Sequence, residues 1–387
     1  MTPRPIRVLG ITQPLSPTSL SRLQSAFHTV HYHPSSPLPP EVFPEIEALF
    51  VPITGLPEGI TSFQALPRLR HVQLASAGAD KLLQHPAIRE CAAWAGAGAP
   101  SAAATVGGGT TQAGRASGAE RDEGVERDIT VSTASGIHVV SIPNWVVANL
   151  IGIYHQLPRM LQIAREQARW STGTEVSSGG TYVARSTRGR TAGMLGYGSL
   201  GRETARLLQA HGMRIVAANT SGNATPQDGY ILPGTGDPTG SIPSAYYSTR
   251  SPTSFADFLR MCDVLVCTLP NTRDTAYLLD EERLALLPKD AVFINVGRGN
   301  LVRSDHLLSA LSHPTRPLLG AALDVTDPEP LPPSHPLWTH PRCIVTPHLS
   351  GDAEGEFELA TDVLLHNLEK IARGERPVNL VDLSRGY

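Results

Sequence analysis

The segment GYGSLG, at residues 196–201, limits the fold of this chain more than any other feature. It follows the apolar run TAGML (191–195), precedes an amphipathic stretch, and is followed in turn by a second apolar run, RIVAAN (214–219). Glycines at the first, third and sixth positions are typical of a turn that joins a buried strand to a helix and lets a pyrophosphate approach the backbone. The complete strand–turn–helix–strand pattern predicts a dinucleotide-binding unit.

Each residue of this turn has a separate part in that prediction. Gly196 would permit the tight turn, Gly198 the approach of the backbone to a pyrophosphate, and Gly201 the close packing of helix against strand. The amides near Ser199 and Leu200 would lie at a helix N-terminus, which favours an anion. These five residues are the first candidate cofactor contacts.

The end of the second strand bears on the choice of cofactor. Asn219 stands where an acidic side chain would bind the ribose hydroxyls of NAD and repel the 2′-phosphate of NADP. Asn219 is uncharged, and Thr220 and Ser221 offer hydroxyl donors. This removes the obstacle to NADP, although no obvious arginine follows to hold a phosphate. We therefore expect NAD or NADP, with a modest preference for NADP.

The rest of the chain continues the α/β pattern. Its 387 residues suffice for two domains of about 100–200 residues each. Buried strands are predicted at 6–11, 48–53 and 69–74, with a helix at 19–27, and this alternation indicates parallel layering. A net charge of −3 argues against nucleic acid as the main partner.

Two stretches interrupt this alternation. Residues 92–127 are rich in Ala, Gly and Ser and have almost no large apolar side chain after Trp94, so we predict a disordered insertion there. Residues 222–253 contain prolines and tyrosines and predict an ordered surface loop. A long helix with a break at Pro158 is predicted over 142–170, and a last helix over 353–373.

The sequence also bears on the compartment. No continuous apolar run reaches the roughly 18 residues that span a bilayer, and the proline-rich N-terminus does not resemble a signal peptide. The four cysteines show no metal-binding spacing. We expect a cytoplasmic protein with reduced thiols and no metal, and with neither a membrane nor a nucleic acid as partner.

Three ionisable residues downstream could carry catalysis. Arg298, between Gly297 and Gly299, follows the predicted strand AVFINV, and α/β sheets bind ligands at the carboxyl ends of their strands. Its planar guanidinium suits a carboxylate or a polarised keto oxygen. His348 follows the strand CIVTP and could exchange a proton near neutral pH. Glu329 beside it would orient the ring and favour the protonated form.

The surrounding motifs resemble those of the D-isomer-specific 2-hydroxyacid dehydrogenase family. The matching segments are DVLVCTLPNTRDTAYLLDEERLALLPKDAVFINVGRGNLV (263–302), GAALDVTDPEPLPPSHPLW (320–338) and IVTPHLSG (344–351), with a weaker match in SAGAD (76–80). The resemblance implies a Rossmann-type doubly wound parallel sheet inserted into a smaller flavodoxin-like α/β substrate domain, with the cofactor in the cleft between them.

The resemblance also implies domain boundaries. The substrate domain would take residues 1–145, the NAD(P)-binding domain residues 146–349, and the return to the substrate domain residues 350–387. A homodimer is the expected assembly.

The activity that the resemblance implies is interconversion of 2-keto acids and D-2-hydroxy acids by hydride transfer. His348 would be the acid/base, Glu329 its support and Arg298 the anion clamp. Asp324 would face the nicotinamide amide. The backbone of Ser76, Ala77 and Gly78 would receive the substrate carboxylate. Further cofactor contacts are implied at Leu269, Pro270, Thr275, Val296, Gly297 and Ser350.

The sequence leaves alternatives open for the substrate and for the functional class of the protein. The family often has Glu-His where this chain has Asn144-Trp145, so glyoxylate, hydroxypyruvate or a bulkier keto acid would all fit. A formate dehydrogenase is one rival, but hydride loss from formate needs no protonated His–Glu pair. A non-catalytic NAD(H)-sensing corepressor is the other, and it would need no catalytic triad.

Overall fold

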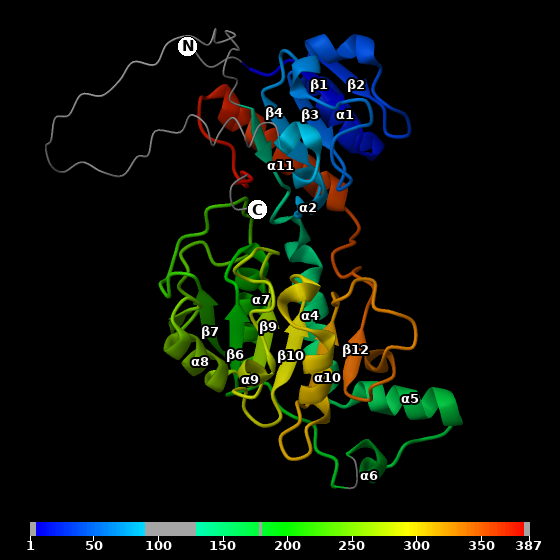
Figure 1. Ribbon diagram of the computed structural model, residues 1–387, viewed down its shortest axis with the longest axis vertical. Helices are drawn as coiled ribbons and strands as arrows, with labels where there is room; N and C mark the ends of the chain where they lie inside the picture. The colour runs from blue at the N-terminus through cyan, green and yellow to red at the C-terminus, as the bar shows by residue number, and fades with distance from the viewer. Residues whose placement is uncertain (1–4, 90–128, 178–179, 383–387) are drawn as a thin grey trace, which may run out of the picture. The chain divides into compact units, whose positions relative to one another are not determined.

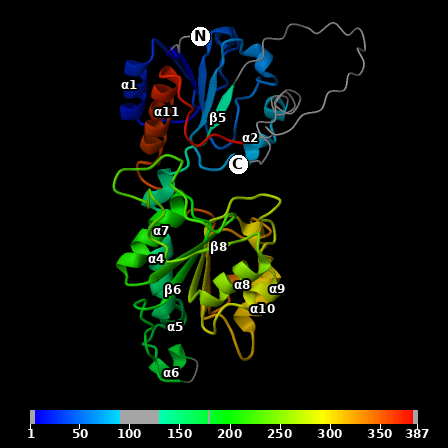
Figure 2. The same cartoon turned by 90° about the vertical axis from the view of Figure 1, so that its left-hand side faces the viewer.

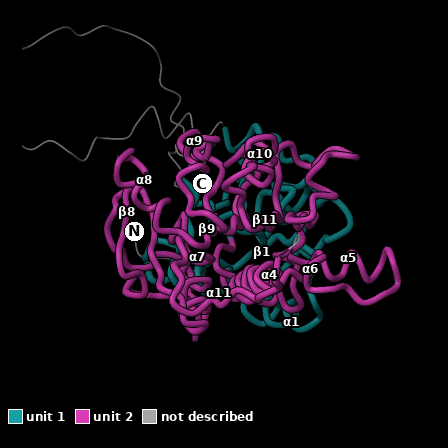
Figure 3. Tube along the Cα trace, turned by 90° about the horizontal axis from the view of Figure 1, so that it is seen from below, with its two compact units in different colours: residues 1–133, 364–386 teal, residues 134–363, 387 magenta. Residues whose placement is uncertain are grey.

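The computed structural model describes residues 5–89, 129–177 and 180–382 (Figure 1). The chain divides into two compact units (Figure 3): unit 1 comprises residues 1–133 and 364–386, and unit 2 comprises residues 134–363 together with residue 387. The insertion predicted at 92–127 lies outside the described residues.

Unit 1 is built on a sheet of five parallel strands in the order β2-β1-β3-β4-β5. With β1 between β2 and β3, this is the strand order of flavodoxin-like sheets. The strands are β1 (Val8–Ile11), β2 (Thr29–Tyr32), β3 (Ala48–Val51), β4 (His71–Leu74) and β5 (Thr130–Ser132).

The helices of unit 1 include one from the end of the chain. Within unit 1, Asn367 of α11 (Glu356–Ala372) donates from Nδ2 to Oε1 of Gln73 on β4, at 2.8 Å, and both side chains are buried. This bond ties the last helix to the first part of the chain. The other helical elements are α1 (Pro17–Ala26), η1 (Pro40–Glu45), η2 (Phe63–Ala65) and α2 (Asp80–Leu83).

Unit 2 is built on seven parallel strands in the order β12-β11-β10-β9-β6-β7-β8. The order reverses between β6 and β9, which is the switch point where doubly wound sheets bind dinucleotides. The strands at 191–195 and 214–219 have the predicted bounds. The seven are β6 (Thr191–Leu195), β7 (Arg214–Asn219), β8 (Tyr246–Ser248), β9 (Val264–Cys267), β10 (Val292–Asn295), β11 (Gly320–Leu323) and β12 (Cys343–Val345).

Helices cover both faces of this sheet (Figure 2). On one face, Val146 and Leu208 lie in a core with the strands, and on the other face Phe258 and Leu307 do so. The strands are therefore buried on both sides, as parallel strands usually are. The helices are α4 (Ile142–Tyr154) and α7 (Ser199–Ala210) on the first face, and α8 (Pro252–Met261), α9 (Glu281–Leu284) and α10 (Ser304–Ser312) on the second. The short helices are η3 (Ile137–Val140), η4 (Gly299–Leu301) and η5 (Pro336–Trp338).

The long helix predicted over 142–170 is two helices, α4 and α5 (Leu157–Gln167). The break lies at Gln156, whose φ of 54° is left-handed, and not at Pro158. Pro158 falls in the first turn of α5, where its missing N–H costs no hydrogen bond. The short helix α6 (Gly173–Val176) follows.

The stretch Ile137–Tyr154 is long and apolar enough to cross a membrane by length and composition alone, with a mean hydropathy of 1.4. Half of it is buried inside the protein. Polar residues such as Ser141 and Asn144 interrupt it, so it is not a continuous apolar run. The buried core helix of a globular domain meets the same criteria, and the feature is weak evidence for a membrane span.

The stretch 222–253 is ordered, as predicted, and buried charges hold it against α7. Asp237 is 4% exposed and accepts hydrogen bonds from the Tyr197 hydroxyl at 2.8 Å and from the backbone of Ile242 at 2.9 Å. Arg202, at 2% exposure, donates to the carbonyl oxygens of Asp237 and Thr225 at 2.6 and 2.7 Å. The stretch also contains strand β8, which the sequence analysis did not predict.

The two compact units divide after Thr133 and after Val363. The domain boundaries that the resemblance implies, 145/146 and 349/350, stay predictions. The first eight residues of unit 2 lead into α4, which begins at Ile142 and packs on the seven-stranded sheet. The second division lies inside α11, so that helix takes part in both units.

Candidate active site

The glycine turn between β6 and α7 has the geometry that the fingerprint predicts. Gly196 has a φ of 96°, which a residue with a side chain rarely adopts. A Cβ on Gly201 would lie 2.4 Å from the Gly196 carbonyl oxygen, so the helix could not pack this closely with any other residue there. A Cβ on Gly198 would meet nothing within 4 Å. The turn is therefore closed on the protein side and open where a pyrophosphate would lie.

The other candidate residues follow the carboxyl ends of neighbouring strands. Pro270 follows β9, Arg298 follows β10, Asp324 follows β11 and His348 follows β12. Because the strands are parallel and adjacent, these residues lie along one edge of one sheet, the edge that carries the glycine turn.

The turns after β9 and β10 touch one another. A Cβ on Gly297 would lie 2.6 Å from the carbonyl oxygen of Leu269, so Gly297 is required for this approach. Thr275 donates from its hydroxyl to the Pro270 carbonyl at 2.6 Å and closes the turn after β9. Val296 is 6% exposed and packs in the sheet core. Cofactor contacts by Leu269, Pro270, Thr275, Val296 and Gly297 remain predictions.

Asn219 at the end of β7 is engaged locally. Its Nδ2 donates to the Asn223 carbonyl at 2.8 Å, and its Oδ1 accepts from the backbone of Gly222 at 2.7 Å and from the Ser221 hydroxyl at 3.2 Å. The Thr220 carbonyl accepts from Ser248 on β8. The side chain therefore shapes the turn that would border an adenosine ribose.

The sequence analysis missed an arginine beside this turn. Strand β8 pairs with β7, and the N–H of Thr249 donates to the Asn219 carbonyl at 2.9 Å, which brings the next residue, Arg250, to the same edge. Arg250 is exposed. Within the described residues its guanidinium has no ion pair. A prediction of strand β8 would have placed Arg250 at this edge. The sequence around β8 lacks the alternation of apolar and polar residues that marks a strand.

His348 and Glu329 form the predicted pair. His348 Nδ1 lies 2.6 Å from Glu329 Oε1, and the two side chains are 49% and 41% exposed. Because Nδ1 faces the carboxylate, Nε2 is the ring nitrogen left to exchange a proton with a ligand. His348 has a φ of 57°, in the left-handed region that non-glycine residues seldom occupy.

The loop that carries His348 is held by Asp324. This carboxylate, 3% exposed, accepts from the Thr346 hydroxyl at 2.6 Å, from the backbone of Leu349 and of Ser350 at 3.1 Å each, and from the Ser350 hydroxyl. A carboxylate has about four acceptor positions, so these four bonds occupy it. Asp324 thus shapes the loop around His348, and its expected contact with the nicotinamide, like that of Ser350, remains a prediction.

Arg298 projects from a tightly fixed backbone. Asn295 donates from Nδ2 to the Arg298 carbonyl at 3.0 Å, and Arg298 Nη1 donates to the Gly297 carbonyl at 2.9 Å. A Cβ on Gly299 would lie only 1.8 Å from the Thr326 carbonyl oxygen, so this position requires glycine. The arginine is therefore fixed at its base by the turns that follow β10 and β11.

The residues expected to receive a carboxylate belong to unit 1. Ser76, Ala77 and Gly78 follow β4, and the Ser76 hydroxyl donates to the Gly78 carbonyl at 2.8 Å. This bond closes a small turn. A role in binding substrate stays a prediction.

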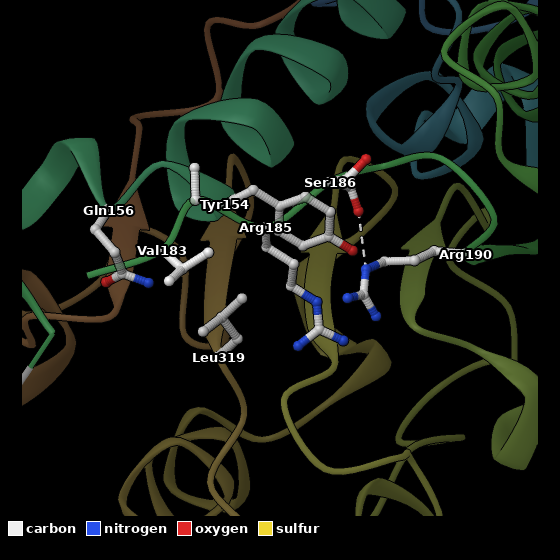
Figure 4. A pocket seen from close by; sticks show the side chains of 8 residues that line it. Tyr154, Gln156, Val183, Arg185, Ser186, Arg190 and Leu319 are labelled. Carbon is white, nitrogen blue, oxygen red and sulfur yellow. Dashed lines mark hydrogen bonds between the residues drawn. The ribbon is translucent and has the colours of Figure 1, made fainter. Parts of the chain in front are cut away.

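A cavity of about 320 Å³ lies at the opposite edge of the seven-stranded sheet (Figure 4). It is lined by Tyr154 and by Leu319, just before β11, and the guanidiniums of Arg185 and Arg190 lie 5.5 and 6.0 Å from the Tyr154 ring centre. Both arginines pair with Asp263. The cavity contains none of the candidate catalytic residues, which lie at the carboxyl ends of the strands.

Comparison with known proteins decides the family. The model described as "D-isomer specific 2-hydroxyacid dehydrogenase, NAD binding domain" matches residues 147–233 and 235–350. The chain belongs to the D-isomer specific 2-hydroxyacid dehydrogenase family. The matched residues include the glycine turn, Arg298, Glu329 and His348.

The chain is also similar to individual proteins and solved structures. The chain is 32% identical over 242 residues, 62% of its length, to an uncharacterized protein in the proB 3′ region of Corynebacterium melassecola, and the match covers 72% of that protein. A family member from Xanthobacter autotrophicus Py2, solved with NADPH and MES, superposes with a TM-score of 0.69 at 24% identity, over 99% of this chain and 100% of the other. A glyoxylate reductase from Paecilomyes thermophila superposes with a TM-score of 0.67 at 20% identity, over 98% and 100%. At these identities the two structures establish the fold alone.

Proposed function

We propose that this member of the family interconverts a 2-keto acid and a D-2-hydroxy acid with a nicotinamide cofactor. The observation that carries the proposal is the contact of 2.6 Å between His348 and Glu329 at the sheet edge that also presents Arg298 and the glycine turn. An acid, an anion-binding cation and a nucleotide turn on one edge are what this reaction requires.

The residues present fit a dinucleotide. The turn after β6 leaves the space beside Gly198 open, and the N–H groups at the start of α7 face that space, as an anion site at a helix N-terminus requires. When bound, the nicotinamide supplies or accepts the hydride. The remaining steps belong to the chain's own side chains.

Arg298 and His348 would have different tasks toward the substrate: Arg298 would bind it, and His348 would exchange a proton with it. The Arg298 guanidinium would bind the carboxylate or the keto oxygen through its planar donors. During reduction the keto carbon gains a hydride, and His348 Nε2 gives its proton to the oxygen. Glu329 would hold the ring through Nδ1 and stabilise its positive charge before the transfer. In the oxidation direction His348 would take the proton back.

We propose NADP over NAD as the better cofactor. Asn219 places no negative charge near the ribose, and Arg250 adds a positive one at the same edge. A carboxylate at the end of β7 would repel a 2′-phosphate, and an arginine there would attract it. The Xanthobacter relative was solved with NADPH, which agrees with this preference.

The proposed substrate is a small 2-keto acid such as glyoxylate or hydroxypyruvate. The likeness to a glyoxylate reductase supports this choice. Trp145, at the start of α4, is partly buried and packs against the sheet core.

A homodimer is proposed through α5 and α6. These helices extend from the body of unit 2 (Figure 1), and their surroundings carry exposed apolar side chains. Trp170 is 95% exposed and Val183 is 77% exposed, with Leu157 and Leu161 also exposed. An apolar cluster of this kind typically marks a protein contact, and we assign it to a second copy of the chain.

The test of the proposed function is turnover. The purified protein is mixed with NADPH or NADH and with a series of 2-keto acids, and loss of the reduced nicotinamide is followed by absorbance. We expect reduction of at least one small keto acid, and His348→Ala should lower kcat by about 10²–10⁴. Tight nucleotide binding with no turnover would favour the corepressor, and oxidation of formate would favour a formate dehydrogenase.

A further inference from the structure

His138, on η3, contacts the loop that carries His348. Its Nδ1 lies 3.2 Å from the Gly351 carbonyl oxygen, and a carbonyl oxygen can only accept, so Nδ1 carries a hydrogen. A Cβ on Gly351 would lie 3.3 Å from Nδ1, so the small residue helps to allow the approach. The two partners are 213 positions apart in the sequence, and no motif singled out His138.

A second donor reaches the same oxygen. The Ser141 hydroxyl donates to the Gly351 carbonyl at 3.2 Å. Gly351 directly follows Ser350, whose backbone and hydroxyl are bound by Asp324. Asp324 thus holds the loop on both sides of His348, at Thr346 and at Leu349 and Ser350, and His138 and Ser141 hold it at Gly351, three residues after His348.

Both attachments bear on the unusual backbone of His348. A left-handed φ is unfavourable for a non-glycine residue, so it persists only where the surroundings impose it. If one attachment were lost, His348 could relax toward an ordinary backbone conformation. Its ring would then move from Glu329, because the 2.6 Å contact depends on where the loop holds it.

The surroundings of His138 favour its neutral form, chiefly through burial. Burial lowers its pKa, and the positive charges of Arg298 and His348 lower it further, against the bond to Gly351 and the charge of Asp352, which raise it. Glu356 on α11 is 3.9 Å from Nδ1, and its own pKa is raised, first by burial and then by Asp352. A neutral His138 can hold the loop without repelling a protonated His348.

We propose that His138 is a positioning residue, whose Nδ1–H bond to Gly351 keeps His348 against Glu329. The role of His348 in catalysis rests on the proposed function, but the structural part of this inference does not. It concerns the ionisation of one imidazole in the free protein.

Two variants distinguish the hydrogen bond to Gly351 from the bulk of the His138 ring. His138→Asn keeps an N–H donor close to the position of Nδ1, and His138→Leu keeps bulk but has no donor. The readout is the pH midpoint at which the His348 Hε1 signal titrates in NMR spectra of the free protein, assigned with His348→Asn. We expect His138→Leu to move the midpoint to lower pH, because the negative charge of Glu329 would no longer lie against the ring, and His138→Asn to leave it close to wild type.

Activity provides the second readout. His138→Leu should lower kcat by about five- to tenfold, the factor that corresponds to one lost hydrogen bond, with an unchanged KM for NADPH. His71→Leu is the matched control, because His71 is a fully buried histidine of unit 1. It should lower the melting temperature without moving the His348 midpoint.

An unchanged midpoint in His138→Leu, with a loss of melting temperature like that of His71→Leu, would overturn the inference. Equal effects of His138→Asn and His138→Leu would also overturn it. If the wild-type protein reduces no 2-keto acid, the proposed function fails, and the NMR titration still decides the role of His138.

Discussion

Several buried side chains in this protein hold the backbone around the candidate catalytic residues. Asp324 was expected to face the nicotinamide, yet its four hydrogen bonds go to the loop around His348. His348 in turn occupies a left-handed conformation that only such bonds can maintain. The backbone that carries the His348 ring is thus held by a buried carboxylate.

Arg298 provides a prediction at this scale. Arg298→Gln removes the charge that would bind the substrate carboxylate, so KM for the keto acid should rise roughly 10- to 100-fold, as expected for charge-assisted hydrogen bonds. Affinity for NADPH, measured by fluorescence, should stay the same. Arg303→Gln is the control, because Arg303 lies over the Tyr277 ring. Equal KM values for the two variants would contradict the role of Arg298.

The proposed preference for NADP rests on two residues at one sheet edge, Asn219 and Arg250. Arg250→Gln should weaken NADPH binding about tenfold, the worth of one charged contact, and leave NADH binding unchanged. Asn219→Asp should raise the ratio of kcat/KM for NADH over NADPH, because a carboxylate there repels the 2′-phosphate. Arg260→Gln is the control, because Arg260 is an exposed arginine on α8. A loss of NADH affinity in Arg250→Gln equal to that for NADPH would show that Arg250 does not meet the 2′-phosphate.

Among the elements, the turn between β6 and α7 is the most demanding. It combines a left-handed glycine, a glycine packed against a carbonyl oxygen and a glycine beside open space. The three positions have different physical requirements, although one motif describes them all.

That difference can be measured with a matched pair of alanines. Gly201→Ala forces a Cβ to within 2.4 Å of a backbone oxygen, so it should destabilise unit 2 by about 1–3 kcal/mol. Gly198→Ala should leave the unfolding midpoint in urea near wild type but weaken nucleotide binding, since its Cβ enters the open space. If Gly198→Ala proves to be the destabilising variant, the turn has been misassigned.

Sequence reasoning succeeds where local constraints are strong. The bounds of β6 and β7 follow from their apolar runs and from the glycines between them, and the pairing of His348 with Glu329 follows from the family motifs. Strand β8 escaped prediction because its Tyr-Tyr-Ser sequence stands among prolines and glycines. Gln156 breaks the long helix through its backbone conformation, which no composition reveals. His138 escaped notice because its partner is distant in the chain.

On the scale of the whole molecule, the two units have separate parallel sheets and separate cores. Unit 2 carries the nucleotide turn, Arg298, Glu329 and His348, so the groups proposed for proton transfer can be preorganised within one unit. The exposed apolar side chains of α5 and its surroundings, which include Trp170, are distant in the sequence from Arg298, Glu329 and His348.

The proposed dimer makes a prediction for this cluster. Trp170→Glu places a charge in the contact, and loss of a central aromatic residue commonly costs at least about 2 kcal/mol of association. Light scattering after size exclusion should show a dimer for wild type and a monomer for the variant. Trp338→Glu is the control, because Trp338 is also exposed, on η5. A wild-type monomer, or a dimer that survives Trp170→Glu, would rule out this interface.

The central claim is that Glu329 stabilises the protonated form of His348, which would supply the proton when the cofactor reduces the keto acid. The most direct measurement is the pH dependence of keto-acid reduction in wild type and in Glu329→Gln. Reduction consumes the imidazolium proton, so the rate should be high at low pH and fall as rising pH removes that proton. The glutamine keeps the shape but not the charge, so the fall should move to lower pH, while reduction at low pH partly survives. An unshifted fall in Glu329→Gln would show that the 2.6 Å contact between Glu329 and His348 has no part in the proton transfer.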